Sequence, residues 1–213
     1  MSDIRSRIDA RIVEGSLLTH PFYRSWSAGE LSREALAGYA AEYFQLVKAV
    51  PGFLERTMEV APAAMRDELV EHRDEEAEHV APWRGFARAL DVAEGDLDAH
   101  RPLPETDEAV ATMNEAVSGS FIEAAAAMYA LELEIPKIAQ TKMEGLCEFY
   151  GIEDDEAVEY FRLHTEADVR HAATWRDILD RAAPEDEPRI VDAVERSLRA
   201  QHRLLDGCVR VYC

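Results

Sequence analysis

The sequence predicts an all-α fold, a single bundle of about seven helices that takes in residues 1–213. Nearly every segment repeats apolar residues at the spacing of an amphipathic helix, and none alternates apolar and polar residues as a half-buried strand does. A chain of 213 residues can bury a substantial core, and no stretch is long and polar enough to be a linker between two domains.

The boundaries of the expected helices come from their caps and from their breakers. Ser32 is a predicted N-cap, and Gly151 is placed to end a helix in the left-handed conformation. Residues 20–29 form an aromatic turn, and residues 91–106 a loop with one turn of helix at most. The expected helices are 2–15, 32–60 with a kink or an end at Pro51-Gly52, 62–90 with a bend near Pro82, 107–118, 121–150 with a kink at Pro136, 153–182 and 187–212.

The composition excludes several classes of protein. A net charge of −20 repels nucleic-acid phosphates, and no run of 18 apolar residues suggests a membrane span. Three cysteines are too few for a disulfide framework, and the first residues are charged, unlike a signal peptide, so we expect a cytoplasmic protein. Of the 23 basic residues only Lys48, Lys137 and Lys142 are lysines, against 43 acidic residues. This balance is typical of a halophilic cytoplasm, where salt screens the repulsion between carboxylates.

The segment YFRLHTEADVRH, residues 160–171, carries three potential metal ligands. His164, Asp168 and His171 are spaced i, i+4 and i+7, which places them within roughly 60° around one helix. Two imidazoles and a carboxylate suit divalent iron or manganese. The alternative is a solvated acidic face with two incidental histidines.

Two further helices offer complementary ligands. His79 follows Glu75 by four residues and Glu76 by three, so either carboxylate could share an ion with it, as in carboxylate-bridged di-iron proteins. Glu132 lies in an apolar helix, where a carboxylate must be paired, protonated or metal-bound. His72 shares the face of His79 and could be a spare ligand, but a surface histidine is the preferred interpretation.

Together these helices predict a dinuclear site with positions left open for oxygen. The candidate ligands are three imidazoles and three carboxylates: Glu75, His79, Glu132, His164, Asp168 and His171.

Four ordered segments resemble the family of the chlamydia protein associating with death domains (CADD), a branch of the TenA/PqqC superfamily. They are HPFYRSWSAGELSREALAGYAAEYF, DEEAEHVAPWRGFARAL, YALELEIPKIAQTKMEGLCEFYGI and YFRLHTEADVRHA. The resemblance covers roughly residues 15–182 and implies a haem-oxygenase-like bundle that binds two transition-metal ions, iron or manganese and iron, with molecular oxygen as co-substrate. The family supplies p-aminobenzoate for folate-type cofactors, using one of the protein's own tyrosines.

The resemblance assigns roles to individual residues. The consumed tyrosine matches Tyr23, the lysine implicated as amino donor matches Lys142, and Tyr39 matches a second tyrosine of the pocket. The family's second-helix glutamate stands seven residues before its histidine, whereas Glu75 stands only four before His79, which leaves the choice between Glu75 and Glu76 open.

Other functions remain as alternatives. An oxidase could use the same ions on an external small molecule. A thiaminase II-like hydrolase would need a nucleophilic cysteine on the central helix, yet residues 124–130 contain none; Glu42 could stand for its pocket acid or support the site indirectly. A binding or regulatory protein would have no need of six convergent ligands. Apolar residues near Tyr212 are compatible with a homodimer.

Overall fold

The computed structural model describes residues 2–213, with side chains from Ile4 onward, and within that range it contains helices and connections but no strand. The predicted all-α fold is therefore confirmed. The helices are α1 (Ser2–Glu14), α2 (Pro21–Ser27), α3 (Arg33–Val60), α4 (Arg66–Ala89), α5 (Glu94–Ala99), α6 (Pro104–Ala116), α7 (Phe121–Glu132), α8 (Ile135–Tyr150), α9 (Asp155–His164), α10 (Ala167–Leu179) and α11 (Glu187–Tyr212).

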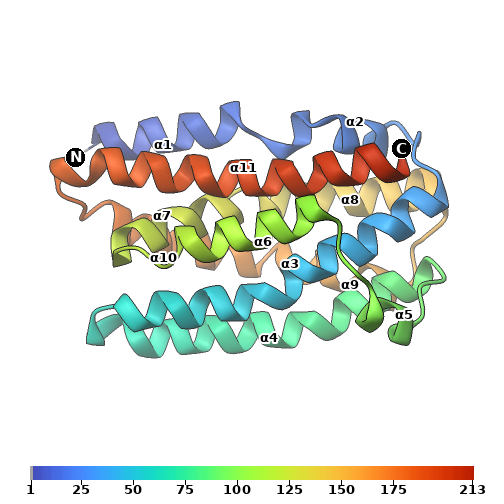
Figure 1. The fold of residues 1–213 in the computed structure, drawn as a ribbon, viewed down its shortest axis with the longest axis horizontal. Coiled ribbons are helices and arrows are strands. Elements are labelled where there is room, and N and C mark those ends of the chain that lie inside the picture. The colour runs from blue at the N-terminus through green and yellow to red at the C-terminus, as the bar shows by residue number, and fades with distance from the viewer. Residues whose placement is uncertain (1) are drawn as a thin grey trace.

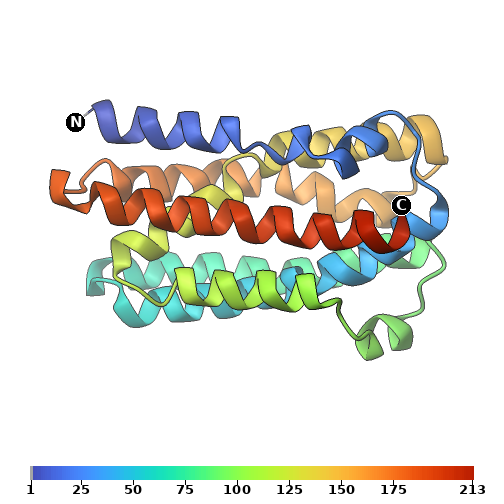
Figure 2. The ribbon, with the colours of Figure 1, turned by 45° about the horizontal axis from the view of Figure 1, so that its top comes forward.

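The long helices run along the length of the molecule and enclose one core (Figures 1 and 2). α3 packs along α4, α4 along α9, and α7 along α10, while α11 contacts α6, α7 and α1. The short α2 rests on α8 near one end of the bundle. α4, α7, α9 and α10 thus surround a common interior region.

Local sequence signals explain several helix ends. The hydroxyl of Ser32 accepts a hydrogen bond of 3.0 Å from the backbone N–H of Ala35, as predicted for the N-cap of α3. Gly151 ends α8 with a φ of 62°, a left-handed conformation that glycine adopts without strain. α3 and α4 continue through Pro51 and Pro82, so Pro51 does not end its helix.

The predicted helix 121–150 is two helices, not one kinked helix. α7 ends at Glu132 and α8 begins at Ile135. Pro136 explains the position of this break, because a proline ring clashes with the carbonyl four residues earlier, which here belongs to Glu132. Glu132 and Lys142, expected on one helix, consequently lie on different helices.

The predicted helix 153–182 is also divided. α9 ends at His164 and α10 begins at Ala167. The hydroxyl of Thr165 donates a hydrogen bond of 2.7 Å to the carbonyl of Arg162, a local contact that competes with helical continuation. His164 therefore lies on one helix and Asp168 with His171 on the next, whereas the sequence analysis placed all three on a single helix.

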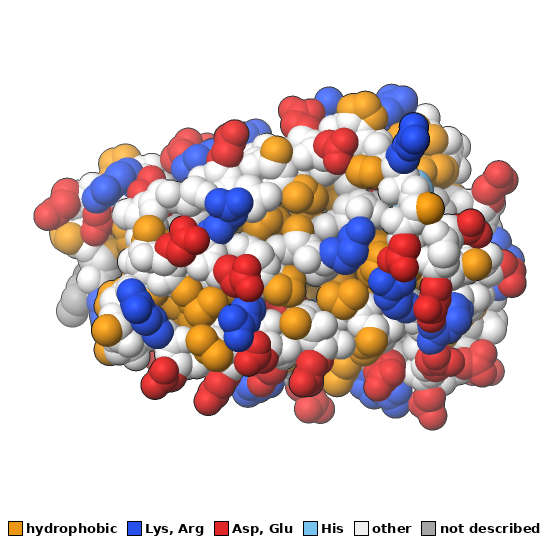
Figure 3. All heavy atoms as spheres, turned by 60° about the horizontal axis from the view of Figure 1, so that its bottom comes forward, with side chains coloured by type: hydrophobic (Ala, Val, Ile, Leu, Met, Phe, Trp, Pro, Cys, Tyr) orange, Lys and Arg blue, Asp and Glu red, His pale blue; other side chains and the backbone are white. Residues whose placement is uncertain are grey.

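The surface mixes charges of both signs. On the face shown in Figure 3, acidic and basic side chains are interspersed, with hydrophobic side chains visible between them. Arginines pair with carboxylates, as in Arg84–Asp98 at 2.7 Å and Arg203–Glu108 at 2.8 Å. Among the described residues, no helix is both long and apolar enough to cross a lipid bilayer.

Candidate metal centre

Seven histidine and carboxylate side chains from four helices meet inside the bundle. Each is less than a tenth exposed, which is unusual for charged residues unless they are paired or bind metal. They are His72, Glu76 and His79 from α4, Glu132 from α7, His164 from α9, and Asp168 and His171 from α10.

α4 places His72, Glu76 and His79 on its inner face. Their spacing of i, i+4 and i+7 keeps the three side chains on one side of the helix. The expectation that His72 is a surface histidine is wrong, since its exposed fraction is 5%. Glu75 is about one-third exposed and lies at the outer edge, so Glu76 is the residue that joins His79 inside the bundle.

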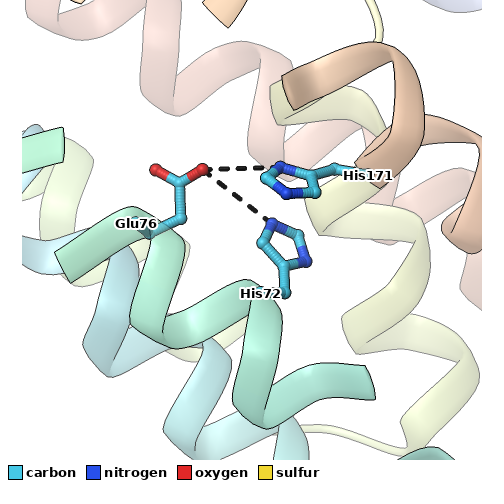
Figure 4. A group of neighbouring side chains, drawn as sticks. All are labelled: His72, Glu76 and His171. Atoms are coloured by element: carbon cyan, nitrogen blue, oxygen red, sulfur yellow. Dashed lines mark ion pairs between the residues drawn. The ribbon is translucent and has the colours of Figure 1, made fainter. Parts of the chain in front are cut away.

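The carboxylate of Glu76 lies between two pairs of histidines. Its Oε2 is 3.5 Å from Nδ1 of His79 and 3.8 Å from Nε2 of His164. Its Oε1 is 3.5 Å from Nδ1 of His171 and 4.0 Å from Nε2 of His72 (Figure 4). Each oxygen thus faces one imidazole pair, the arrangement expected of a carboxylate that bridges two ions.

The other two carboxylates lie on the side of His72 and His171. Glu132 Oε1 is 3.4 Å from Nε2 of His72, and Asp168 Oδ1 is 3.9 Å from Nδ1 of His171. Trp175 fixes the second oxygen of Glu132 by donating a hydrogen bond of 2.6 Å from its indole N–H. The two halves of the centre therefore differ in carboxylate content.

The donor set fits metal ions. Five buried atoms of the centre have no hydrogen-bonding partner within the described chain: Nε2 of His72, Nδ1 of His79 and His171, Oε1 of Glu132 and Oδ2 of Asp168. Ligand atoms of three overlapping groups lie within 4.8 Å of one another: His72, Glu76 and His171; Glu76, His79 and His164; Glu132, Asp168 and His171. Ligand bonds of about 2.0–2.2 Å leave room for an ion among atoms at such separations.

Burial and neighbouring charges shift the pKa values of side chains in the centre in opposite directions. Burial lowers the pKa of His72 to about 4 and raises the pKa of Glu132 and of Asp168 above their usual range. Burial also opposes charge on His171, but the nearby carboxylates outweigh it and raise the pKa of that imidazole to about 9. Bound cations would replace the shared protons and relieve this competition.

A second polar group lies beside the metal centre and contains the residues singled out by the resemblance. Lys142 is 3% exposed, and its Nζ donates a hydrogen bond of 2.6 Å to the hydroxyl of Tyr39. The Tyr39 hydroxyl is 3.2 Å from that of Tyr23. Burial lowers the pKa of Lys142 to about 7 and raises the pKa of both tyrosines well above 10.0. Lys142 is therefore not a surface lysine, and both phenols are neutral.

Close packing between α2 and α8 creates this arrangement. Gly145 faces Trp26, and a Cβ at this position would come within 2.7 Å of the indole ring. The Trp26 indole N–H donates a hydrogen bond of 3.2 Å to the backbone carbonyl of Lys142. His20 caps α2 by accepting a hydrogen bond of 3.2 Å from the Phe22 N–H. These contacts hold Tyr23 beside Lys142.

Aromatic rings connect the two groups. Tyr160 stacks on His164 at 4.0 Å between ring centroids and meets the edge of Trp83 at 4.7 Å. Trp83 stacks on Tyr43 at 5.0 Å, and Tyr43 lies 5.3 Å from Tyr39. Ring contacts therefore lead from the metal centre as far as Tyr39, whose hydroxyl lies 3.2 Å from the hydroxyl of Tyr23.

The sequence analysis considered His72 as a spare ligand but preferred a surface histidine, and it left Glu76 undecided, although the sequence contained a signal for both. His72, Glu76 and His79 repeat the spacing of His164, Asp168 and His171, so each segment reads His-x3-acid-x2-His. In the structure the two segments pair crosswise: the rings of His72 and His171 are 3.5 Å apart, and those of His79 and His164 are 4.5 Å apart.

Glu42 takes no part in the metal centre. Its carboxylate is fully buried and accepts hydrogen bonds from the Leu103 N–H at 3.0 Å and the Tyr212 hydroxyl at 3.2 Å, with His100 Nε2 at 2.6 Å. These bonds fasten the loop before α6 and the end of α11 to α3. The thiaminase II-like alternative would need a nucleophilic cysteine on the central helix α7, and α7 contains no cysteine.

Comparison with known proteins identifies the family of this chain. Residues 38–202 match a family of iron-containing redox enzymes. The chain is 33% identical to a 4-aminobenzoate synthase of Nitrosomonas europaea, over 98% of this chain and 92% of the relative. It is 32% identical to a 4-aminobenzoate synthase of Chlamydia muridarum, over 94% and 88% of the two chains.

The fold is shared with solved structures. A Shewanella denitrificans domain of unknown function with a haem-oxygenase-like fold superposes with a TM-score of 0.84 at 17% identity, covering 99% of this chain and 92% of that one. The predicted fold type and the resemblance to the CADD group are both confirmed. The chain therefore belongs to the haem-oxygenase-like family of iron-containing redox enzymes that includes the 4-aminobenzoate synthases.

Proposed function

We propose that this protein is a dinuclear-metal oxygenase that forms 4-aminobenzoate from the side chain of its own Tyr23. The observation that carries the proposal is the position of Lys142, whose buried amine lies 5.3 Å from the centroid of the Tyr23 ring and bonds to Tyr39, the hydroxyl partner of Tyr23. The names of the relatives and their family support the product and the redox chemistry.

The ligands divide between two ions. His79 and His164 would hold one ion, and His72, His171 and Glu132 the other, with Asp168 beside them and Glu76 shared between the ions. The description of the family as iron-containing supports iron as the bound metal. The richer carboxylate content of the second half would suit a harder ion, so a manganese and iron pair is the alternative to two irons.

The bound ions would supply the activation of dioxygen. The chain's own residues then determine where that oxidising power acts. Tyr160, Trp83, Tyr43 and Tyr39 place rings in contact between His164 and Tyr23, so oxidation of the Tyr23 phenol does not require that Tyr23 itself touch an ion.

The position of Lys142 supports its role as the source of the nitrogen. In 4-aminobenzoate the nitrogen is on the ring carbon that bears the hydroxyl group in tyrosine. Lys142 Nζ is 5.3 Å from the centroid of the Tyr23 ring and reaches its hydroxyl through Tyr39. Because the pKa of Lys142 is lowered to about 7, a substantial fraction of the amine is unprotonated and nucleophilic at neutral pH.

Mass spectrometry of the protein after reaction tests the proposal. Self-consumption leaves a trimmed residue at position 23 and at most one product molecule per chain. Tyr23→Phe should bind the same ions and give no product. Protein made with 15N-labelled lysine should pass the label to the product, while unlabelled product from such protein would contradict the role of Lys142.

An external substrate is the second candidate. A cavity next to the centre is lined by apolar side chains, including Leu46, Val47 and Val50, and by the polar Glu76 and His164. The cavity is small, about 30 Å³, so an external substrate would reach the ions only after these side chains moved. Sustained turnover by Tyr23→Phe, with residue 23 intact in spent wild-type protein, would favour this candidate.

A further inference from the structure

Glu75 contacts the metal centre from outside, through the outer nitrogen of His171. Its Oε2 is 2.8 Å from Nε2 of His171. Both Glu75 oxygens also accept hydrogen bonds from the guanidinium of Arg170, at 3.2 and 3.1 Å. The Glu75 carboxylate is therefore held by two groups, the imidazole of His171 and the guanidinium of Arg170.

This contact determines which nitrogen of His171 faces inward. A neutral imidazole has one N–H and one free lone pair, and a hydrogen bond to one nitrogen selects the other as the ligand atom. With Nε2–H donating to Glu75, the lone pair is on Nδ1. That nitrogen faces Glu76 at 3.5 Å and Asp168 at 3.9 Å, and no described residue forms a hydrogen bond with it.

In the other half of the centre, a hydrogen bond also selects the inward-facing nitrogen of His164, but the acceptor is a backbone carbonyl. Nδ1 of His164 lies 2.6 Å from the backbone carbonyl of Tyr160, which leaves Nε2 to face Glu76. A backbone carbonyl is fixed by its helix, whereas the Glu75 carboxylate is a flexible, partly exposed side chain. Arg170 restricts the Glu75 carboxylate, just as the helix restricts the carbonyl that bonds to His164.

We propose that Glu75 is a positioning residue, anchored by Arg170, that sets the orientation and the ligand nitrogen of His171. The inference rests on the proposed metal centre and gives Glu75 a role in place of direct ligation. It predicts that Glu75 controls the affinity of the half-site that contains His171, without touching the ion itself.

The inference can be tested by measuring the affinity for Mn²⁺ by calorimetry, on protein from which a chelator has removed all metal. Glu75→Ala should weaken binding of one Mn²⁺ by about 10–100-fold, the usual effect of losing such a hydrogen bond to a ligand histidine. Glu75→Gln, whose amide oxygen still accepts the bond, should lose less. Arg170→Ala should weaken the binding of the same ion, by a smaller factor. Glu71→Ala removes the same charge from the same surface hollow and should bind as the wild type does.

The ring nitrogens of His171 give a second measurement, in Zn²⁺-loaded protein labelled with 15N-histidine. The expected spectrum has the metal on Nδ1 and the proton on Nε2 in the wild type, and loses this single arrangement in Glu75→Ala. Circular dichroism and thermal melting confirm that each variant is folded.

Three results would overturn the inference. Equal Mn²⁺ affinity of Glu75→Ala and Glu71→Ala would show that Glu75 has no effect beyond its charge, and metal on Nε2 of His171 would exclude the positioning role. Either result leaves the metal centre intact. Absence of binding by the wild type would instead remove the centre and the inference together.

Discussion

The Nζ of Lys142 and the hydroxyl of Tyr39 are joined by a hydrogen bond of 2.6 Å inside the aromatic core. The rings of Tyr23, Tyr43 and Phe161 lie 4.7–5.3 Å from the same nitrogen. Among the residues whose side chains are described, no carboxylate pairs with this nitrogen, so its surroundings are aromatic and uncharged. Such a site favours the uncharged nucleophile over the ammonium ion.

Protein stability should therefore depend on pH through Lys142. Burial lowers the pKa of this lysine from 10.5 to about 7. Between these values the unfolded chain binds a proton that the folded chain does not, so the free energy of unfolding should rise as pH increases from 7 to 10. The gain is on the order of 3–5 kcal/mol. Lys142→Met should remove this dependence in denaturant titrations, whereas an unchanged slope would contradict the lowered pKa.

Glu76→Gln should empty both halves of the centre. Its two oxygens face both histidine pairs, and an amide cannot supply two anionic ligand atoms. Elemental analysis of protein purified without chelator should fall from two ions per chain to fewer than one. Glu78→Gln, an exposed neighbour on the same helix, is the matched control and should retain both ions.

His72→Ala should remove one ion and leave the other. His72 lies with His171 and Glu132, while His79 and His164 form the other half with Glu76. The expected content is about one ion per chain. The control is His202→Ala. His202 lies 2.9 Å from the carbonyl oxygen of Gly15 and is not among the residues of the centre, so this variant should keep two ions per chain. Loss of both ions in His72→Ala would show that the halves do not fill independently.

Gly145→Ala should separate α2 from α8. The added methyl group meets the Trp26 ring at 2.7 Å, so we expect a loss of about 1–3 kcal/mol in the free energy of unfolding and a larger loss of product. Gly52→Ala adds a methyl group to the interior of α3 with nothing within 4 Å and should stabilise the protein by about 0.5–1 kcal/mol. Equal stability of the two variants would contradict the packing argument.

Salt should stabilise the protein. Forty-three acidic residues against 23 basic ones repel one another, and ions screen this repulsion. The melting temperature should rise from dilute buffer to molar potassium chloride. Equal melting temperatures in the two solutions would refute the halophilic interpretation.

The sequence was sufficient to predict the fold class, the Ser32 and Gly151 caps and five of the seven side chains that converge inside the bundle. These follow from short-range rules: capping residues, left-handed glycine and spacing on a helical face. The helix breaks before Pro136 and at Thr165 were missed because the apolar periodicity continues across both.

The choice between Glu75 and Glu76 could not be made from spacing. Both lie on the side of α4 that carries His79, and only the position of α10 separates them. His171 reaches Glu76 with one nitrogen and Glu75 with the other, so neither carboxylate is idle. The burial of His72 also depends on α10, whose His171 ring covers it.

The anchoring of α2 has a consequence for the cell. His20 contacts Asp206 on α11, and Trp26 bonds to the backbone of Lys142; neither contact needs the ring of Tyr23. Under the proposed self-consumption, a chain that had given up that ring would therefore keep the contacts that anchor α2. The supply of 4-aminobenzoate would then depend on how fast ribosomes replace spent chains.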